Sequence, residues 1–391
     1  MQRLLPRSCA GLIGMVIVGT FALAQSAVAG PLTSTQRSST SLLLRLPSPP
    51  TLTATTVPGN GDVNPYGVAF VPHDFARGGV LNPKDILVSN FNNGANQQGT
   101  GTTIVRITPQ GQTSVFFQGQ PGLGLTTALK VLKRGFVVVG NLPTTDGTSA
   151  TLQSPGSLLI LDKMGNLVLT LQDPTLLDGP WDMAVHDDRD HVRLFVSNVL
   201  SGTVTRVDLR IEERGRWKRT RTSASTTTTT VNVVNMTRIA SGYAFSTDPV
   251  ALVLGPTGLA FDSHRDLLYV ASTADNAIYS IPDARRTKTD QGMGTLVYQD
   301  DAYLRGPLGL VLTPNGNLIA SNGDTVNADP GFPSELVEFT PSGQFVAQMP
   351  VDANGTGGAF GLDLMTFGHQ TILAAVDDVA NTVEVWDVKR H

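Results

Sequence analysis

The stretch Gly255-Pro-Thr-Gly-Leu-Ala-Phe261 decides the fold, because its pattern returns along the chain at a nearly regular spacing. Close copies are Asn64-Pro-Tyr-Gly-Val-Ala-Phe70 and Gly306-Pro-Leu-Gly-Leu-Val-Leu312, and looser copies begin at Leu125, Gly179 and Gly358. The aligned positions Gly67, Thr126, Asp182, Gly258, Gly309 and Gly361 are separated by 59, 56, 76, 51 and 52 residues. A period in this range indicates a repeat architecture.

Each copy continues into short runs of β-branched, aromatic and aliphatic residues bounded by Gly, Pro, Asn and Asp, a pattern typical of strands. Four such runs per copy and six copies predict an all-β fold, a six-bladed β-propeller with four antiparallel strands per blade. The sixth copy ends at Val388 without a fourth strand. Thr51–Val57 can supply that strand, so we expect the N-terminal strand to close the ring and remove an open edge.

The propeller is expected to span residues 51–391, with one insertion in the third blade at residues 210–237. This insertion carries basic residues and the tract Thr226–Thr230, and its composition predicts a solvated loop. Residues 30–50 are rich in Ser, Thr, Pro and Leu, and are predicted to form a linker.

Residues 1–29 resemble a signal peptide: Arg3 and Arg7 precede an apolar stretch, and Ala27-Val-Ala29 fits the small-residue cleavage rule. A retained membrane anchor is the alternative, because the apolar stretch approaches the length that spans a bilayer. Cleavage predicts a secreted or periplasmic protein with no membrane insertion. It also removes Cys9, the only cysteine, and so excludes disulfides from the mature chain.

The charge balance argues against nucleic acid as a partner. The chain has 28 basic and 32 acidic residues, and removing Arg3 and Arg7 with the signal peptide leaves 26 − 32 = −6. A net negative charge favours solubility and disfavours binding to nucleic acid or to anionic membranes.

Topology predicts where a ligand site would lie. In an antiparallel blade the start of the first strand lies beside the end of the second, so the Pro-x-Gly turns and the polar residues that end the second strands share one face. They should surround the mouth of the central channel, a concave place where ligands commonly bind. The candidate ligand-binding residues are Tyr66, Asn90, Asn141, Trp181, Asp182, Asn198, Thr273, Asn322, Phe360 and Asp377.

Two interpretations of these polar residues stay open. Asn, Ser and Asp at strand ends often satisfy backbone groups of the adjoining turn, and a repeat protein needs this in every blade. Trp181 and Asp182 differ from this pattern, because they replace a small turn residue and the motif glycine. An aromatic ring beside a carboxylate at the mouth suits contact with a ligand.

The repeat Pro-x-Gly-φ-Ala-φ, followed by φ-φ-Val-Ser-Asn (φ an apolar residue), resembles the NHL-repeat family. More widely it resembles the six-bladed superfamily that includes SMP-30/gluconolactonase and strictosidine-synthase-like proteins. The resemblance covers about residues 51–388. In the lactonase branch it implies a divalent-metal site whose ligands, a Glu, an Asn and an Asp, lie in the turns that open the innermost strands. The corresponding residues here are Tyr66, Thr257, Leu308 and Phe360, none of which is a carboxylate or an amide.

Two functions from different classes follow. The first is a non-catalytic module, extracytoplasmic and NHL-like, that binds a small molecule or a protein through the polar mouth. The alternative is a metal-dependent hydrolase of SMP-30/lactonase type, with a divalent cation such as calcium. Its candidate metal ligands are Asn141, Asp182, Asn198 and Asp377.

Overall fold

A computed structural model describes residues 41–215, 227–323, 326, 331, 335–351 and 358–389. The predicted signal peptide therefore lies outside the described residues. Within them the chain forms six four-stranded antiparallel sheets, one two-stranded hairpin and two short 3-10 helices, η1 (Leu43–Arg45) and η2 (Ser149–Thr151). None of the described helices is long and apolar enough to cross a membrane.

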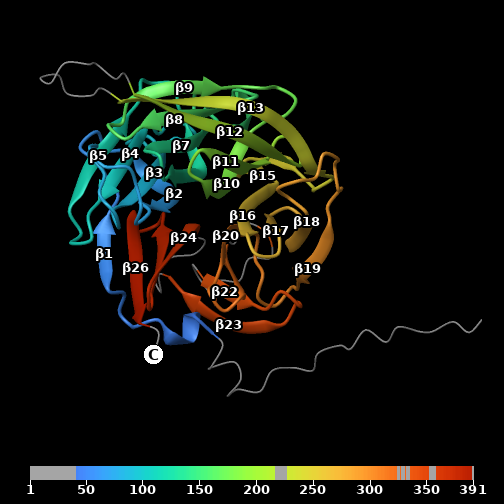
Figure 1. The fold of residues 1–391 in the computed structure, drawn as a ribbon. Helices are drawn as coiled ribbons and strands as arrows, with labels where there is room; N and C mark the ends of the chain where they lie inside the picture. The colour runs from blue at the N-terminus through green and yellow to red at the C-terminus, as the bar shows by residue number, and fades with distance from the viewer. Residues whose placement is uncertain are drawn as a thin grey trace, which may run out of the picture. The chain divides into compact units, whose positions relative to one another are not determined.

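The six sheets are the blades of a propeller (Figure 1), as the repeat predicted. Blade 1 contains β2 (Val63–Phe70), β3 (Ile86–Asn92), β4 (Thr103–Ile107) and β5 (Thr113–Gln118). Blade 2 contains β6 (Leu125–Leu132), β7 (Phe136–Asn141), β8 (Ser157–Asp162) and β9 (Leu167–Leu171). Blade 3 contains β10 (Pro180–Asp188), β11 (His191–Asn198), β12 (Thr203–Gly215) and β13 (Thr227–Ser241).

The second half of the ring repeats the arrangement. Blade 4 contains β16 (Pro256–Asp262), β17 (Leu267–Ser272), β18 (Ala277–Pro282) and β19 (Thr295–Gln299). Blade 5 contains β20 (Pro307–Leu312), β21 (Leu318–Asn322), β22 (Glu335–Phe339) and β23 (Phe345–Pro350). Blade 6 contains β24 (Ala359–Phe367), β25 (Gln370–Asp377), β26 (Thr382–Lys389) and β1 (Leu52–Thr55).

The N-terminal strand closes the ring, as predicted. β1 pairs antiparallel with β26, so that Leu52 lies opposite Val385 and Thr55 lies opposite Thr382. The innermost strands contact one another in the order β2, β6, β10, β16, β20 and β24, and β24 contacts β2. A separate apolar cluster fills each of the six interfaces between successive blades.

The repeated Gly and Ser of the motif have a mechanical role. Every innermost strand has a shift of register at the turn that carries the motif or its looser copy, where its backbone approaches the next blade. A Cβ added at Gly309 would lie 2.5 Å from the carbonyl oxygen of Phe360. Ser89 shows how the gap is bridged: its Oγ accepts from the amide of Gly67 at 3.0 Å and donates to the carbonyl of Thr126, in the next blade, at 2.9 Å. We call the face of the ring that carries these turns the motif face.

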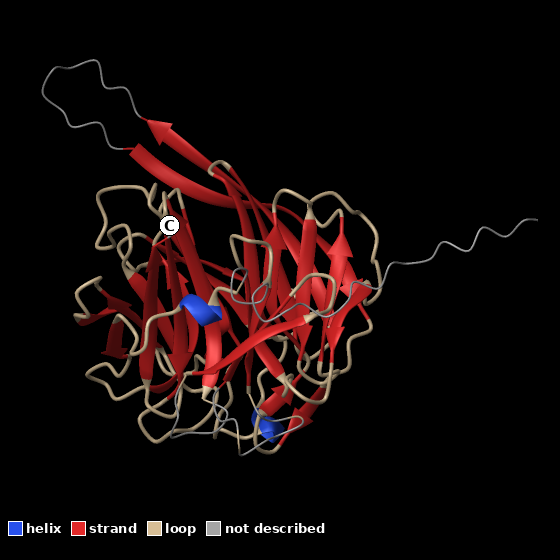
Figure 2. Ribbon diagram, turned by 90° about the horizontal axis from the view of Figure 1, so that it is seen from below, coloured by secondary structure: helices blue, strands red, loops and turns tan. Residues whose placement is uncertain are grey.

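The insertion in blade 3 differs from the predicted solvated loop. Residues 210–215 and 227–237 continue β12 and β13 as a paired hairpin, from Arg210 opposite Asn232 to Gly215 opposite Thr227. The loop prediction was wrong for these residues because Thr, Val and Ile favour extended structure once a partner strand is present. The hairpin projects at the end of the ring opposite the motif face (Figure 2).

Residues 41–46, within the segment assigned to a linker, pack against blade 5. Leu42 and Leu43 are buried among residues of blades 5 and 6. The carboxylate of the fully buried Glu338 accepts from Ser41 Oγ at 2.7 Å and from the amides of Leu42 and Leu43 at 3.1 and 3.0 Å. The side chains of Leu42 and Leu43, together with the buried carboxylate of Glu338, anchor the segment to the ring.

Candidate functional site

The asparagines that end the second strands turn into their own blades. Asn141 accepts from the amide of Gly124 at 2.8 Å and donates to Ser157 Oγ at 3.1 Å. Asn322 accepts from the amide of Arg305 at 3.0 Å and donates to the carbonyl of Tyr303 at 2.7 Å. These contacts match the turn-stabilising interpretation of the repeated polar residues.

The other strand-end residues also bond to backbone groups, and Thr273 reaches β20 of the next blade. Asn90 donates to the carbonyl of Thr56 at 2.9 Å, and Asn198 donates to the carbonyl of Leu176 at 3.2 Å. Thr273 donates to the carbonyl of Pro307 at 2.8 Å, Asp377 accepts from the amides of Val379 and Ala380 at 3.0 and 3.2 Å, and all four side chains are buried. The Oδ1 atoms of Asn90 and Asn198 have no hydrogen-bond partner within the described part of the chain.

The aromatic candidates come together at the centre of the motif face. Tyr66 stacks on Phe360 and on Phe91, with ring centroids 4.4 and 4.6 Å apart, and Trp181 meets Tyr66 edge-on at 5.7 Å. Tyr66, Trp181 and Phe360 lie at the start of the innermost strands of blades 1, 3 and 6, and Phe91 lies on β3 of blade 1. All four rings pack in one apolar cluster with Leu252 and Val253, called here the aromatic cluster. The sequence predicted a polar funnel at this place, and the structure puts buried aromatic rings there.

Asp182 lies apart from the asparagines, in a group of charges on the innermost strands. Lys130 Nζ, on β6, lies 3.3 Å from Asp363 Oδ1, on β24, and the two side chains are 16% and 21% exposed. Lys130 and Asp363 lie close enough to Asp182, on β10, to affect its pKa, and Asp182 in turn affects the pKa of Lys130. The three residues, called here the channel charge cluster, come from blades 2, 3 and 6 and so meet inside the ring.

Both carboxylates of the channel charge cluster also accept backbone hydrogen bonds. Asp182 Oδ1 accepts from the amide of Met183 at 2.6 Å, and Oδ2 accepts from the amide of Leu259, in the next blade, at 3.3 Å. Asp363 Oδ2 accepts from the amide of Phe70, in blade 1, at 2.8 Å. These bonds fix the carboxylates and join neighbouring blades.

The environment gives the cluster unusual protonation behaviour. Burial raises the pKa of Asp182 to about 7, against the opposing effect of Lys130. Burial acts to lower the pKa of Lys130, but the carboxylates of Asp363 and Asp182 outweigh it and the pKa is raised. Lys130 therefore stays charged at neutral pH while Asp182 can exchange a proton, which is the behaviour expected of an acid–base group.

A second carboxyl with a shifted pKa lies at the mouth. Burial, followed by the charge of Asp377, raises the pKa of Asp378 to about 7. Asp378 is near the hydroxyl of Tyr66, whose own pKa burial also raises. Among the described residues, Asp378 Oδ1, Asn64 Oδ1 and Trp181 Nε1 are buried without a hydrogen-bond partner.

The candidate metal ligands do not form an evident cation site. Asn141 and Asn198 direct their amides to their own blades, Asp377 caps a turn, and Asp182 accepts backbone amides. Within the described ranges no three His, Cys, Asp or Glu side chains group as a metal site. The donor set therefore does not fit a lactonase-type divalent cation.

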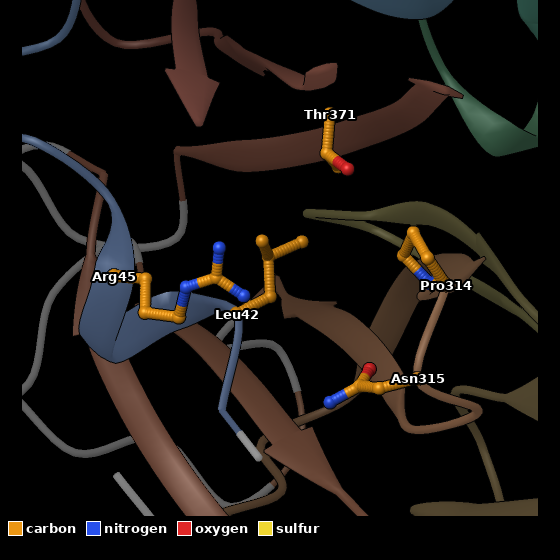
Figure 3. Close-up of a pocket in the computed structure, with 5 residues that line it drawn as sticks. All are labelled: Leu42, Arg45, Pro314, Asn315 and Thr371. Carbon is orange, nitrogen blue, oxygen red and sulfur yellow. The ribbon is translucent and has the colours of Figure 1, made fainter. Parts of the chain in front are cut away.

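A pocket of about 170 Å³ lies on the face opposite the motif face (Figure 3). It is lined by Leu42, Arg45, Pro314, Asn315 and Thr371. None of these residues belongs to an innermost strand, so the pocket is separate from the channel charge cluster.

Sequence reasoning missed Lys130 and Asp363, because neither lies in the repeated motif. A signal was available: each is the only charged residue in an otherwise apolar or neutral innermost strand, Leu125–Leu132 and Ala359–Phe367. A charge in such a strand must find a partner near the channel.

Comparisons with known proteins find similar solved structures but no matching family. No family model and no curated protein matches the chain. Similar solved structures include a gluconolactonase from Xanthomonas campestris (12% identity, TM-score 0.48, 85% of this chain and 88% of that one) and a calcium-binding protein, regucalcin, from Agrobacterium tumefaciens (13%, 0.47, 86% and 95%). A chain of the nidogen–laminin complex is similar to the same degree (12%, 0.47, 77% and 84%). SMP-30/gluconolactonase/regucalcin-like six-bladed propellers are thus among the structures this chain is similar to, as its motif suggested, and the NHL label stays a prediction.

Proposed function

We propose that the channel charge cluster is the functional site and that the protein is a hydrolase of small lactones or esters. The observation that carries the proposal is Asp182, a carboxyl with a pKa of about 7, beside the charged Lys130 inside the ring. The lactone or ester class comes from the resemblance of the repeat motif to the lactonase branch. The signal-like residues 1–29 favour action outside the cytoplasm.

The reaction uses the residues of the chain itself. The ionised carboxylate of Asp182 accepts a proton from a water molecule, whose oxygen attacks the carbonyl carbon of the substrate. The ammonium of Lys130, oriented by Asp363, stabilises the negative charge that develops on the carbonyl oxygen. The tetrahedral intermediate then breaks its bond to the leaving oxygen, which takes the proton back from Asp182 and leaves a carboxylic acid and an alcohol.

Hydrolysis of a panel of lactones and esters tests the proposal, with and without added calcium or zinc. Asp182→Asn keeps the shape of the side chain but cannot accept the proton, and kcat/KM should fall by about 10²- to 10⁴-fold. Lys130→Met should lower kcat/KM by a similar factor. The matched control is Asp188→Asn, on the same strand but with a 62% exposed side chain, which should behave as wild type.

The dependence on pH sharpens this test. In the wild type kcat/KM should rise to a plateau through about pH 7 as Asp182 ionises, following the raised pKa. Full activity of Asp182→Asn and Lys130→Met would refute the assignment of the site. Activity that appears only with an added cation would refute the residue-based mechanism.

A non-catalytic binding module is the second candidate. It is favoured by the closed aromatic mouth and by the backbone bonds that give Asp182 and Asp363 a structural role. A folded protein that hydrolyses nothing in the panel, yet melts higher with one of its compounds, would support this function instead.

A further inference from the structure

A small hairpin between blades 3 and 4 lies over the aromatic cluster. Its strands, β14 (Ser246–Asp248) and β15 (Leu252–Leu254), pair only with each other and belong to no blade. Leu252 and Val253 are 1% and 6% exposed and pack in the cluster that contains Tyr66 and Trp181. The hairpin therefore contributes part of the closure of the mouth.

The tip of the hairpin reaches a different part of the ring. Val250, at its turn, is 78% exposed, and its carbonyl accepts from Gln98 Nε2, in the β3–β4 loop of blade 1, at 2.7 Å. Asp248 Oδ1 caps the turn by accepting from the amides of Val250 and Ala251, both at 2.7 Å. The hairpin thus reaches from blades 3 and 4 to blade 1, where the hydrogen bond from Gln98 holds its far end.

Leu252 holds a strained backbone conformation. Its φ is +66°, and the amide of Val253 donates to the carbonyl of Ala251 at 2.7 Å, which closes a three-residue turn around Leu252. A bulky side chain rarely adopts positive φ, because Cβ then crowds the following carbonyl oxygen. This γ-turn is rare and strained, and it persists here because Leu252 is buried against aromatic rings.

We propose that the β14–β15 hairpin is a lid that gates the channel from the motif face, with Leu252 as the residue that holds it closed. Burial of Leu252 and Val253 favours the closed state, while the strain at Leu252 and the short strands of the hairpin favour opening. Opening uncovers the rings of the aromatic cluster and the indole N–H of Trp181, which is buried without a hydrogen-bond partner among the described residues. Such a surface suits a small uncharged molecule that has an apolar face and hydroxyl or carbonyl groups.

That this molecule then binds at the channel charge cluster rests on the proposed function, whereas the lid itself does not. Trp181 reports on the lid without any substrate, because it lies in the aromatic cluster and is 2% exposed. The chain has three tryptophans, Trp181, Trp217 and Trp386. A parent protein with Trp217→Phe and Trp386→Phe leaves Trp181 as the only emitter, and acrylamide quenching measures how often it meets solvent.

Two substitutions at one position separate burial from strain. Leu252→Ala removes the side chain that seals the mouth but keeps the strained turn, so the quenching constant of Trp181 should rise about two-fold or more. Leu252→Gly removes the same contacts but accepts positive φ without strain, so quenching should rise less than in Leu252→Ala. Equal quenching of Leu252→Ala and the parent would overturn the proposal, as would a larger rise in Leu252→Gly.

A second reporter excludes general loosening. A protein with Trp181→Phe and Trp217→Phe keeps Trp386, which is 2% exposed in blade 6, and its quenching should not change on Leu252→Ala. A parallel rise at Trp386 would mean that the whole ring had loosened, and the lid would be rejected. In the wild type, amide exchange in residues 246–254 should exceed exchange in β16 and β17, and equal protection would also reject it. If the protein hydrolyses a substrate but the lid does not open, the lid proposal has failed. If the lid opens but nothing is hydrolysed, the proposed function has failed.

Discussion

The anchoring of the N-terminal segment by Glu338 gives a prediction whose size follows from the structure. Glu338 is fully buried and accepts four hydrogen bonds, three from Ser41, Leu42 and Leu43 and one from Asn317 Nδ2 at 2.8 Å. Glu338→Gln keeps the volume, but its amide group presents donors where donors already point. Two lost bonds to a charged acceptor correspond to about 3–6 kcal/mol.

The measured loss should be smaller, because the segment can undock into water and regain conformational entropy. We therefore expect Glu338→Gln to lower the free energy of unfolding by about 2–4 kcal/mol in urea titrations. Leu43, which is 3% exposed, tests the mechanism. Leu43→Ala should cost about 2–4 kcal/mol in the wild type. In Glu338→Gln, where the segment is already released, it should cost less than about 1 kcal/mol.

The assay is a double-mutant cycle, in which the difference between these two costs is the coupling energy between the carboxylate and the docked leucine. Limited proteolysis within residues 41–50 should also become faster in Glu338→Gln. Equal costs of Leu43→Ala in both backgrounds would refute the reasoning, because they would show that the segment stays docked without the carboxylate.

Three further outcomes follow from the ring. Burial raises the pKa of Asp378 from 3.8 to about 7, so the folded state holds a proton there that the unfolded chain releases. The free energy of unfolding should fall as the pH rises from about 4 to 7. In Asp378→Asn this fall should be smaller, so that by pH 8 urea melts show about 1–3 kcal/mol less loss of stability than in the wild type. Gly309→Ala should cost about 1–3 kcal/mol from its clash with Phe360, whereas Gly59→Ala, with open space around it, should be neutral in the same melts. Replacing residues 212–230 by a two-residue turn should leave a cooperatively folding ring by circular dichroism, and loss of the cooperative transition would contradict this.

The architecture was predictable because the repeat carries its physical cause in the sequence. A glycine relieves the crowding where the innermost strand bulges toward the carbonyl of the next blade, as Gly309 does beside Phe360, although Thr126 and Asp182 occupy this position in blades 2 and 3. A serine can bridge the same gap, as Ser89 does between Gly67 and Thr126. The same packing solution in most blades therefore leaves a recurring motif in the sequence.

The direction of the polar side chains was not predictable in the same way. Asn141 at a strand end can turn toward the channel or back to its own turn, and the residue type is the same in both cases. The closure of the mouth by Leu252 depends on a hairpin that appears once and has no repeat to reveal it. Single features such as Lys130 and Asp363 escape a search based on periodicity for the same reason.

The site that emerges lies where the repeat is broken. Asp182 occupies the position of the motif glycine, and its carboxylate accepts the amide of Leu259, so that a charged group joins blades 3 and 4. A carboxylate with only that structural task would be expected to have a normal or lowered pKa, because two backbone amides stabilise its charged form. Its pKa is instead raised to about 7 by burial, even with Lys130 nearby. Asp182 therefore has a pKa near neutrality while its position is fixed by backbone amides, and this is the property that the proposed proton transfer requires.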